Sequence, residues 1–215
     1  MKTFLGAGGA SAITAALLLA FGGSGQAFAQ QVKNLPVVQA VVNTTAPATI
    51  PASPTVSLVN SDATVAREAG WLRQAGWPLY ALVDKFSTGA PLSDEANCIA
   101  VAVYHEARGE SLEGQLAVAQ VIKNRAMSGK YPSDWCGVVK QPWQFSFVRH
   151  GQFPSVDQGS DSWRKAVGVT RLAVANAVPS VPKDCLWYHA NYVAPRWSNN
   201  LRRVEQIGAH IFYRG

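Results

Sequence analysis

The chain has few charged residues and no cluster of basic ones. Charged residues make up only 15% of its 215 residues, whereas hydrophobic residues make up 48%. The net charge of +6 suits anionic partners in general, but lysines and arginines are scattered singly or in pairs such as Arg202-Arg203. Most of the chain should therefore fold around a core, and the lack of a basic run argues against nucleic acid as a partner.

The sequence also has no hydrophobic run that is long enough for a comfortable membrane span. Its apolar stretch at 12–21 follows Lys2 and precedes Ala-Phe-Ala at 27–29. A basic start, a short apolar core and a small-x-small cleavage site predict a secretory signal peptide over residues 1–29. The alternative is an uncleaved anchor. We expect export to the periplasm or to the cell wall and extracellular space, with no stable membrane span after cleavage.

Cysteine is scarce, and its count is odd. The three cysteines are Cys98, Cys136 and Cys185. An exported protein can form disulfides, but an odd number leaves one thiol over. We favour a Cys98–Cys136 disulfide, although sequence does not fix the connectivity.

Residues 30–62 lack aromatic residues and have little charge, and four prolines punctuate them. This composition predicts a flexible linker. Residues 63–92 form the next region, where apolar residues recur at helical spacing before Pro78 interrupts them. We expect a helical pre-region that docks through Trp71 and Trp77; the alternative is a disordered one.

The remaining residues, 93–215, are predicted to form one catalytic-type domain. Ser93 is suited to cap a helix that ends or bends near Gly109. Further helices are expected at about 112–127 and 161–177, with a Pro-, Gly- and aromatic-rich loop between them. Short strands are expected at 186–189 and 210–213. Helices followed by short strands predict an α+β fold, mainly helical, with a small C-terminal β-sheet.

Two glutamates continue the apolar face of the first of these helices. The face consists of Ala96, Ile99, Val103, Glu106 and Glu110. Burial raises the pKa of a carboxyl group, and a protonated Glu can act as general acid in glycoside cleavage. The alternative is a structural network in which both glutamates pair with Arg108, Lys123 or Arg125.

A specific motif surrounds these glutamates. Residues 104–110 read Y-H-E-A-R-G-E and are followed by E-G-Q at 113–115, N-R at 124–125 and Q-F-S at 144–146. The closing segment I-G-x-H-x-F-Y at 207–213 fits the same pattern. From Ser93 to the C-terminus the chain resembles the SleB/CwlJ-type cell wall hydrolases, a family that includes spore-cortex-lytic enzymes.

The resemblance implies a domain similar to lysozymes and lytic transglycosylases, with Glu106 as the catalytic residue. Members cleave peptidoglycan glycan strands between N-acetylmuramic acid and N-acetylglucosamine. A lytic transglycosylase needs one carboxyl group and neither metal nor cofactor, whereas a hydrolase would want a second carboxylate or a held water. Candidates for that second carboxylate are Glu110, Glu113, Asp134 and Asp157.

Other residues are candidates for supporting roles. Aromatic rings stack on the apolar faces of sugars, so a substrate groove is expected to include Trp143, Gln144 and Phe145, with Trp135 nearby; the alternative is core packing. Substrate contact is also expected for Glu110 and His189. Asn124 and Arg125 are expected to fix the catalytic helix by hydrogen bonds. We expect a monomer.

Three other functions compete with this interpretation. His105-Glu106 begins an H-E-x-x-H zinc-peptidase motif, but Gly109 stands where the second His is required. A wall amidase or peptidase would pair a cysteine with His189, yet neither Cys98 nor Cys136 has a nucleophile's surroundings. A non-catalytic peptidoglycan-binding module would need the groove without the acid.

Overall fold

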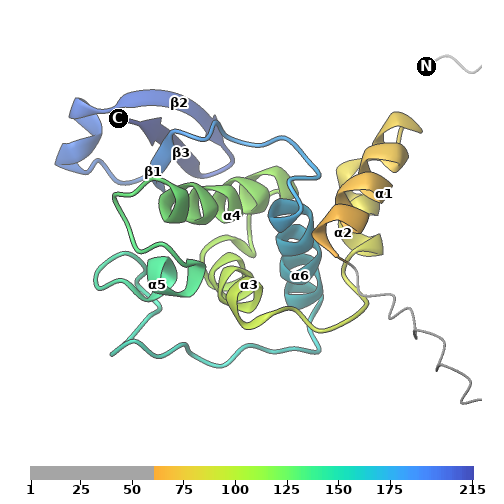
Figure 1. The fold of residues 1–215 in the computed structure, drawn as a ribbon. Coiled ribbons are helices and arrows are strands. Elements are labelled where there is room, and N and C mark those ends of the chain that lie inside the picture. Colours follow the sequence, from red (N-terminus) through yellow and green to blue (C-terminus); the bar gives the residue numbers. More distant parts are fainter. Residues whose placement is uncertain (1–60) are drawn as a thin grey trace, which may run out of the picture. The chain divides into compact units, whose positions relative to one another are not determined.

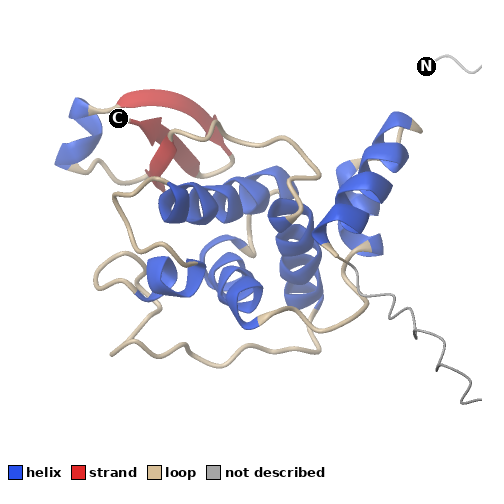
Figure 2. Ribbon diagram, viewed as in Figure 1, coloured by secondary structure: helices blue, strands red, loops and turns tan. Residues whose placement is uncertain are grey.

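The structure is a computed structural model that describes residues 61–215. The predicted signal peptide at 1–29 and the predicted linker up to residue 60 lie outside these residues. The described helices and strands are α1 (Asp62–Gln74), α2 (Leu79–Lys85), α3 (Asp94–Ala107), α4 (Leu112–Met127), α5 (Trp135–Lys140), α6 (Asp161–Val174), β1 (Cys185–Ala190), β2 (Arg202–Ile207) and β3 (His210–Arg214), with a 3₁₀ helix at Arg196–Asn200. Figures 1 and 2 show a helical body with a small sheet beside α4. None of the helices at 61–215 is long and apolar enough to cross a membrane.

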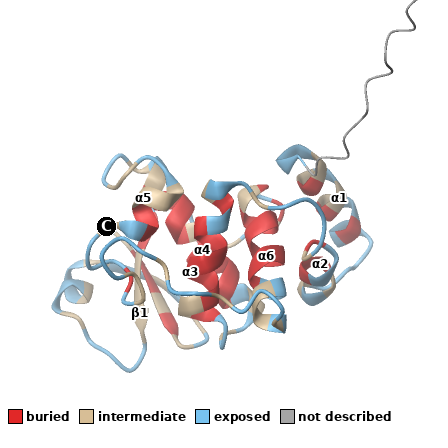
Figure 3. Cartoon of the chain, turned by 90° about the horizontal axis from the view of Figure 1, so that it is seen from below, coloured by how far each residue is buried: buried red, intermediate tan, exposed pale blue. Residues whose placement is uncertain are grey.

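Helices α3, α4 and α6 form the centre of the domain. Each begins at a serine whose hydroxyl accepts a hydrogen bond from the backbone N–H three residues on, at 3.1–3.2 Å. These serines are Ser93, Ser111 and Ser160. The central positions of the three helices are buried on several sides (Figure 3). The expected α+β fold, mainly helical with a small C-terminal sheet, is confirmed.

The C-terminus of α6 differs from the prediction, which extended this helix to Ala177. The helix ends at Val174, because Asn176 adopts a left-handed conformation with φ of 51°. Lys123 of α4 is buried there and donates hydrogen bonds to the Ala173 carbonyl oxygen and to Asn176 Oδ1, the latter at 2.7 Å. The ammonium group therefore satisfies carbonyl groups at the free end of α6.

Helices α1 and α2 pack on α6, but through different residues from those we predicted. Trp71 is 66% exposed and Trp77 is 42% exposed, so the tryptophans do not dock the pre-region. The aliphatic face of the two helices does so instead, and its buried members are Val65, Ala69, Leu72, Leu82 and Val83. Helical spacing predicted the helices correctly, whereas residue size was a poor guide to which side faces the core.

Two contacts hold this pre-region closely against α6. Gly168 lies against the Val83 carbonyl, and a Cβ at this position would overlap that oxygen. Arg171 is buried and donates from Nη1 to the Phe86 carbonyl oxygen at 2.7 Å.

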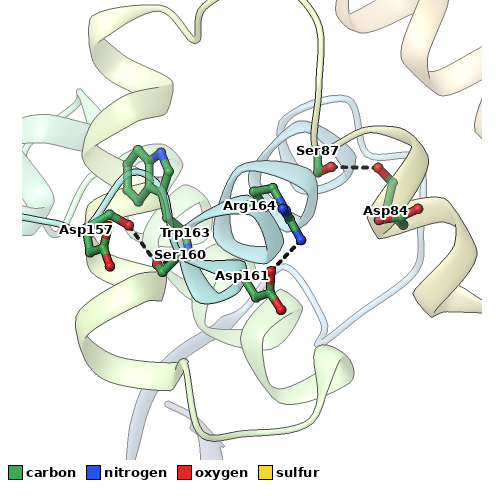
Figure 4. A network of polar contacts seen from close by, with 7 residues as sticks. All are labelled: Asp84, Ser87, Asp157, Ser160, Asp161, Trp163 and Arg164. Carbon is green, nitrogen blue, oxygen red and sulfur yellow. Dashed lines mark hydrogen bonds and ion pairs between the residues drawn. The ribbon is translucent and has the colours of Figure 1, made fainter.

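The first turn of α6 has its own polar network, in which the Ser160 hydroxyl donates to the Asp157 carbonyl oxygen and Asp161 pairs with Arg164 (Figure 4).

Helix α5 lies inside the segment that we predicted to be a loop. Its first N–H groups are capped from two sides: Asp134 Oδ1 accepts from Gly137 at 2.6 Å, and Glu95 Oε2 accepts from Trp135 at 2.6 Å. The predicted Cys98–Cys136 disulfide is present and joins α5 to α3. Glu95 and the disulfide are tertiary contacts, so they stabilise a helix that local sequence does not indicate.

The C-terminal sheet has three antiparallel strands in the order β1-β3-β2. The predicted strands at 186–189 and 210–213 correspond to β1 and β3. The prediction missed β2, an edge strand whose residues are mostly exposed and polar. Edge strands commonly carry polar and charged residues, which hides the alternation that marks a strand.

Candidate active site

Glu106 is in the last turn of α3 and is half-buried. The apolar face of the helix continues as far as Glu106. We had expected it to include Glu110, and it does not. Helix α3 ends at Ala107, because Gly109 follows and Ser111 begins the next helix. The Glu110 N–H bonds back to the Ala107 carbonyl oxygen at 2.9 Å and closes the helix end. The two glutamates therefore occupy different surroundings.

The surroundings of Glu106 favour its protonated form. Burial raises the pKa of Glu106 above its ordinary value, and the positive charge of Arg125 opposes part of this rise. Three ion pairs within 4.0 Å occur among residues 61–215, and neither Glu106 nor Glu110 belongs to one. The alternative of a structural ion-pair network is therefore not realised for either glutamate.

Glu106 opens into a cleft of about 520 Å³. The loop after α5 supplies the rest of the lining, and its members are Trp143, Gln144, Phe145, Ser146 and Val148. Three residues that we predicted to form a sugar groove are thus brought together around the predicted acid. Glu106 is the single carboxylate in this lining.

Trp143 has an unusual conformation for a large side chain. It is 99% exposed, and its φ is 68°, in the left-handed region that non-glycine residues seldom adopt. Folding neither buries the indole nor relaxes its backbone, so packing does not explain this placement. An exposed ring at the edge of a cleft suits stacking on a ligand.

The sequence left open whether Gln144 and Phe145 line a groove or pack in the core. Phe145 packs in the core, and Gln144 lines the cleft. Phe145 is 4% exposed, belongs to the core and has its ring centroid 5.6 Å from that of Phe147. Gln144 is exposed at the cleft. Phe145 therefore supports the cleft from below, whereas Gln144 and Trp143 reach its open side.

Asn124 and Arg125 hold strand β1 rather than the catalytic helix, which corrects our expectation. Asn124 Nδ2 donates to the carbonyl oxygens of Pro182 at 2.8 Å and Cys185 at 3.0 Å. Arg125 Nε donates to the Leu186 carbonyl oxygen at 2.8 Å. Helix α4 lies between α3 and the sheet, so these side chains point toward the sheet and tie it to the helical core.

Arg125 also supplies the positive charge that lowers the pKa of Glu106. Its guanidinium lies 5.1–6.0 Å from the ring centroids of Tyr131, Phe145 and Tyr188. Its buried Nη1 has no hydrogen-bond partner among residues 61–215. The charge is thus held under the cleft by rings and by one carbonyl, where its field reaches the Glu106 carboxyl group.

Tyr188 is a site residue that sequence reasoning missed. Burial raises the pKa of the Tyr188 hydroxyl above its ordinary range, and the negative charge of Glu106 raises it further. The ring of Tyr188 packs against Phe212 of β3, with centroids 5.6 Å apart. Tyr188 lies two residues after buried Leu186 on β1, and this spacing is the signal that could have indicated its inward orientation.

The other candidate carboxylates lie away from this cleft. Glu110 Oε2 accepts a hydrogen bond from the Ala209 N–H at 2.9 Å and so holds the turn between β2 and β3. Asp134 caps α5, and Asp157 Oδ1 accepts from the Gly159 N–H at 3.0 Å. Glu113 is in the first turn of α4.

His189 and Trp135 also lie outside the lining of the Glu106 cleft. His189 Nδ1 is 2.9 Å from the Ala190 carbonyl oxygen, and Nε2 is 2.9 Å from the Tyr213 hydroxyl. Both ring nitrogens are therefore engaged within the sheet. Trp135 begins α5 and packs against the core.

The cysteines do not offer a nucleophile. Cys98 and Cys136 form the disulfide, and Cys185 is buried. Burial is the main cause that raises the pKa of the Cys185 thiol to about 11. A reactive cysteine needs a lowered pKa and access to solvent, and Cys185 has neither. Among residues 61–215, no group of three or more His, Cys, Asp or Glu side chains has the arrangement to hold a metal ion.

Comparison with known proteins supports the resemblance that the motif indicated. The family model described as "Cell Wall Hydrolase" matches residues 109–213, which begin three residues after Glu106. Spore cortex-lytic enzymes are similar in sequence: that of Bacillus subtilis is 32% identical over 120 residues, covering 56% of this chain and 37% of the relative. The enzyme of Oceanobacillus iheyensis is 36% identical over 124 residues, covering 55% of this chain and 41% of the relative.

A solved structure is similar as well. It is the catalytic domain of the germination-specific lytic transglycosylase SleB from Bacillus anthracis, which is 30% identical in sequence. The match covers 59% of this chain and 100% of the solved chain, with a TM-score of 0.47. The family model and the curated relatives support the SleB/CwlJ-type cell wall hydrolase family, which the E-A-R-G-E motif predicted. It spans about two fifths of the length of the curated relatives that it matches.

Proposed function

We propose that this protein cleaves peptidoglycan glycan strands between N-acetylmuramic acid and N-acetylglucosamine as a lytic transglycosylase. One observation carries the proposal: Glu106, whose pKa is raised by burial, opens into a cleft whose edge is a fully exposed tryptophan. A carboxyl group whose pKa is raised keeps its proton to a higher pH and can donate it, and an exposed indole can hold a pyranose ring. The curated relatives are named spore cortex-lytic enzymes, which is consistent with a lytic activity for this chain.

The reaction needs a single carboxyl group in two states. Glu106 first donates its proton to the glycosidic oxygen, and the bond from that oxygen to the muramic acid anomeric carbon breaks. The resulting carboxylate then removes the proton from the 6-hydroxyl of the same sugar, whose oxygen closes onto the anomeric carbon. Arg125 lowers the pKa of Glu106 while burial raises it, so the charged form that exists between these two steps is tolerated.

The placement of the other carboxylates favours transglycosylation over hydrolysis. An inverting hydrolase needs a second carboxylate across the substrate, and a retaining one needs a nucleophile. The candidates Glu110, Asp134 and Asp157 have their oxygens engaged by backbone N–H groups outside the cleft. An intramolecular hydroxyl from the sugar removes the need for such a group.

The remaining residues act around this acid. Trp143 stacks on a sugar, and Gln144 offers an amide for hydrogen bonds to hydroxyl or acetamido groups. Arg125 and Asn124 keep β1 in position, and Tyr188 on that strand keeps water away from Glu106. The predicted signal peptide would deliver the enzyme to the periplasm or wall, where its substrate is found, and we expect it to act there as a monomer.

Mass spectrometry of the products tests the proposal. Purified peptidoglycan is digested with the full-length protein without its signal peptide, and the soluble fragments are analysed. Muropeptides that end in 1,6-anhydro-muramic acid are expected. Reducing ends would indicate hydrolysis, and free peptides with intact strands would indicate an amidase or peptidase. Binding without any release of fragments would indicate a non-catalytic wall-binding module; each of these three results overturns the proposal.

A further inference from the structure

A second cleft lies on the other side of Trp143. Its volume is about 450 Å³, and it shares Trp143 and Val148 with the cleft that contains Glu106. The rest of its lining comes from the end of α5 and from the turn at 149–151. A polymer that stacks on Trp143 beside Glu106 therefore has a neighbouring depression for a substituent.

The turn that closes this cleft has a defined shape. Arg149 and Gln152 exchange two backbone hydrogen bonds, at 3.1 Å and 2.9 Å. His150 and Gly151 between them have φ of 52° and 71°, the values of a tight two-residue turn. The turn fixes the backbone of Arg149, which projects its exposed side chain into the lining.

The charge of the lining has one sign. Lys140 and Arg149 are both exposed, neither belongs to an ion pair among residues 61–215, and no acidic residue lines the cleft. The Lys140 ammonium lies 5.1 Å from the ring centroid of Phe153, which limits its freedom.

The cleft between α2 and α6 is different. It has a volume of about 550 Å³, two of its three cations, Lys85 and Arg164, are paired with Glu68 and Asp161, and two acidic residues line it. Cations without acidic neighbours, as at Lys140 and Arg149, suit an anionic ligand.

We infer that this second cleft binds the carboxylates of the stem peptide that muramic acid carries on its lactyl group. The inference rests on the proposed function, because the glycan must lie across Trp143 for its substituent to reach Lys140 and Arg149. A strand stripped by an amidase keeps one carboxylate on each lactyl group, whereas the stem peptide carries carboxylates further from the sugar, so the two basic side chains select peptide-bearing strands. His150 adds a further polar contact at the rim.

Paired substrates test the inference. One is peptidoglycan with its stem peptides, and the other is the same material after an amidase has removed them. The variants are the double substitution Lys140→Gln/Arg149→Gln and a matched control, Arg67→Gln/Lys183→Gln, whose exposed side chains lie on α1 and before β1. Initial rates of anhydro-end formation are measured at low substrate concentration, in low and in high salt.

The wild type should cleave the peptide-bearing strands with a kcat/KM about tenfold higher than the peptide-free strands, and high salt should reduce this preference. The double variant should lose the preference by slowing on peptide-bearing strands alone. The charge-reversing Lys140→Glu/Arg149→Glu variant should lower that rate further, and the control should behave as wild type.

Other outcomes separate the two proposals. Equal rates on both substrates in the wild type, or an equal loss on both in the double variant, would overturn the stem-peptide inference while the proposed function stands. A wild type that forms anhydro ends on neither substrate would overturn the proposed function itself.

Discussion

The substitution Gly208→Ala tests whether Glu110 has a structural role. Gly208 has φ of 57°, and a Cβ built on it would overlap Glu110 Oε2, the oxygen that accepts the Ala209 N–H. An alanine in the left-handed region costs about 1 kcal/mol. Displacing a half-buried carboxylate from its hydrogen bond costs about 1.5 kcal/mol more. We therefore expect a loss of about 2.5 kcal/mol in the free energy of unfolding.

A matched glycine separates the two contributions. Gly129 has φ of 71°, and nothing lies within 4 Å of a Cβ there. Gly129→Ala should therefore show the backbone cost alone. Thermal unfolding followed by circular dichroism should lower the Tm by about 5–10 °C for Gly208→Ala and by about 2–4 °C for Gly129→Ala.

A double-mutant cycle completes this test. In a Glu110→Ala background, Gly208→Ala should cost no more than Gly129→Ala, since the overlapping carboxylate is gone. If Gly208→Ala is no more destabilising than Gly129→Ala in the wild type, the structural role of Glu110 is refuted.

Three further predictions concern the cleft and its supports. Trp143→Ala should lower kcat/KM on peptidoglycan roughly tenfold or more, and the Tm should not change because the ring is exposed. Trp71→Ala on α1 should change neither kcat/KM nor Tm, and equal effects of the two substitutions would contradict a stacking role. Cys136→Ser, which opens a link across 38 residues, should cost about 4 kcal/mol in denaturant unfolding, and reduction of the wild type should have the same effect. Cleavage should fall as the pH rises through the raised pKa of Glu106, since the acid form donates the proton; a rate that falls already at the pKa of an ordinary carboxyl group would show that burial does not protect this form.

Local signals in the sequence were sufficient for the central helices. Ser93 caps its helix as predicted, and Ser111 and Ser160 cap theirs in the same way. The relation of Glu106 to the apolar face of α3 was also readable, because helical spacing determines which residues share a face. Glu110 was placed wrongly on that face because periodicity does not reveal where a helix ends.

Tertiary contacts account for what the sequence did not reveal. Helix α5 depends on Glu95 and on the disulfide, both from a helix about 40 residues earlier. The strand β2 is stabilised by pairing with β3, and most of its residues are exposed. Trp143 could be named as a candidate, but its full exposure and its left-handed backbone follow from how the loop after α5 folds back.

The same limit applies to supporting residues. Asn124 and Arg125 were identified by their place in the family motif, which does not say which element they bond. The burial of Tyr188 near Glu106 arises where β1 passes over α4, and this arrangement is a property of the fold. Candidate acids can thus be read from spacing, whereas the groups that tune them come from elements distant in sequence.

The substitution Glu106→Gln tests the central claim most directly. Glutamine has nearly the same size and no proton to donate, so the variant should fold and bind peptidoglycan as the wild type does. Since burying the ionised carboxylate costs stability above the raised pKa, the variant should be at least as stable as the wild type at alkaline pH. We expect formation of anhydro ends to fall at least about 100-fold. A folded Glu106→Gln variant that cleaves glycan strands at the wild-type rate would contradict the claim.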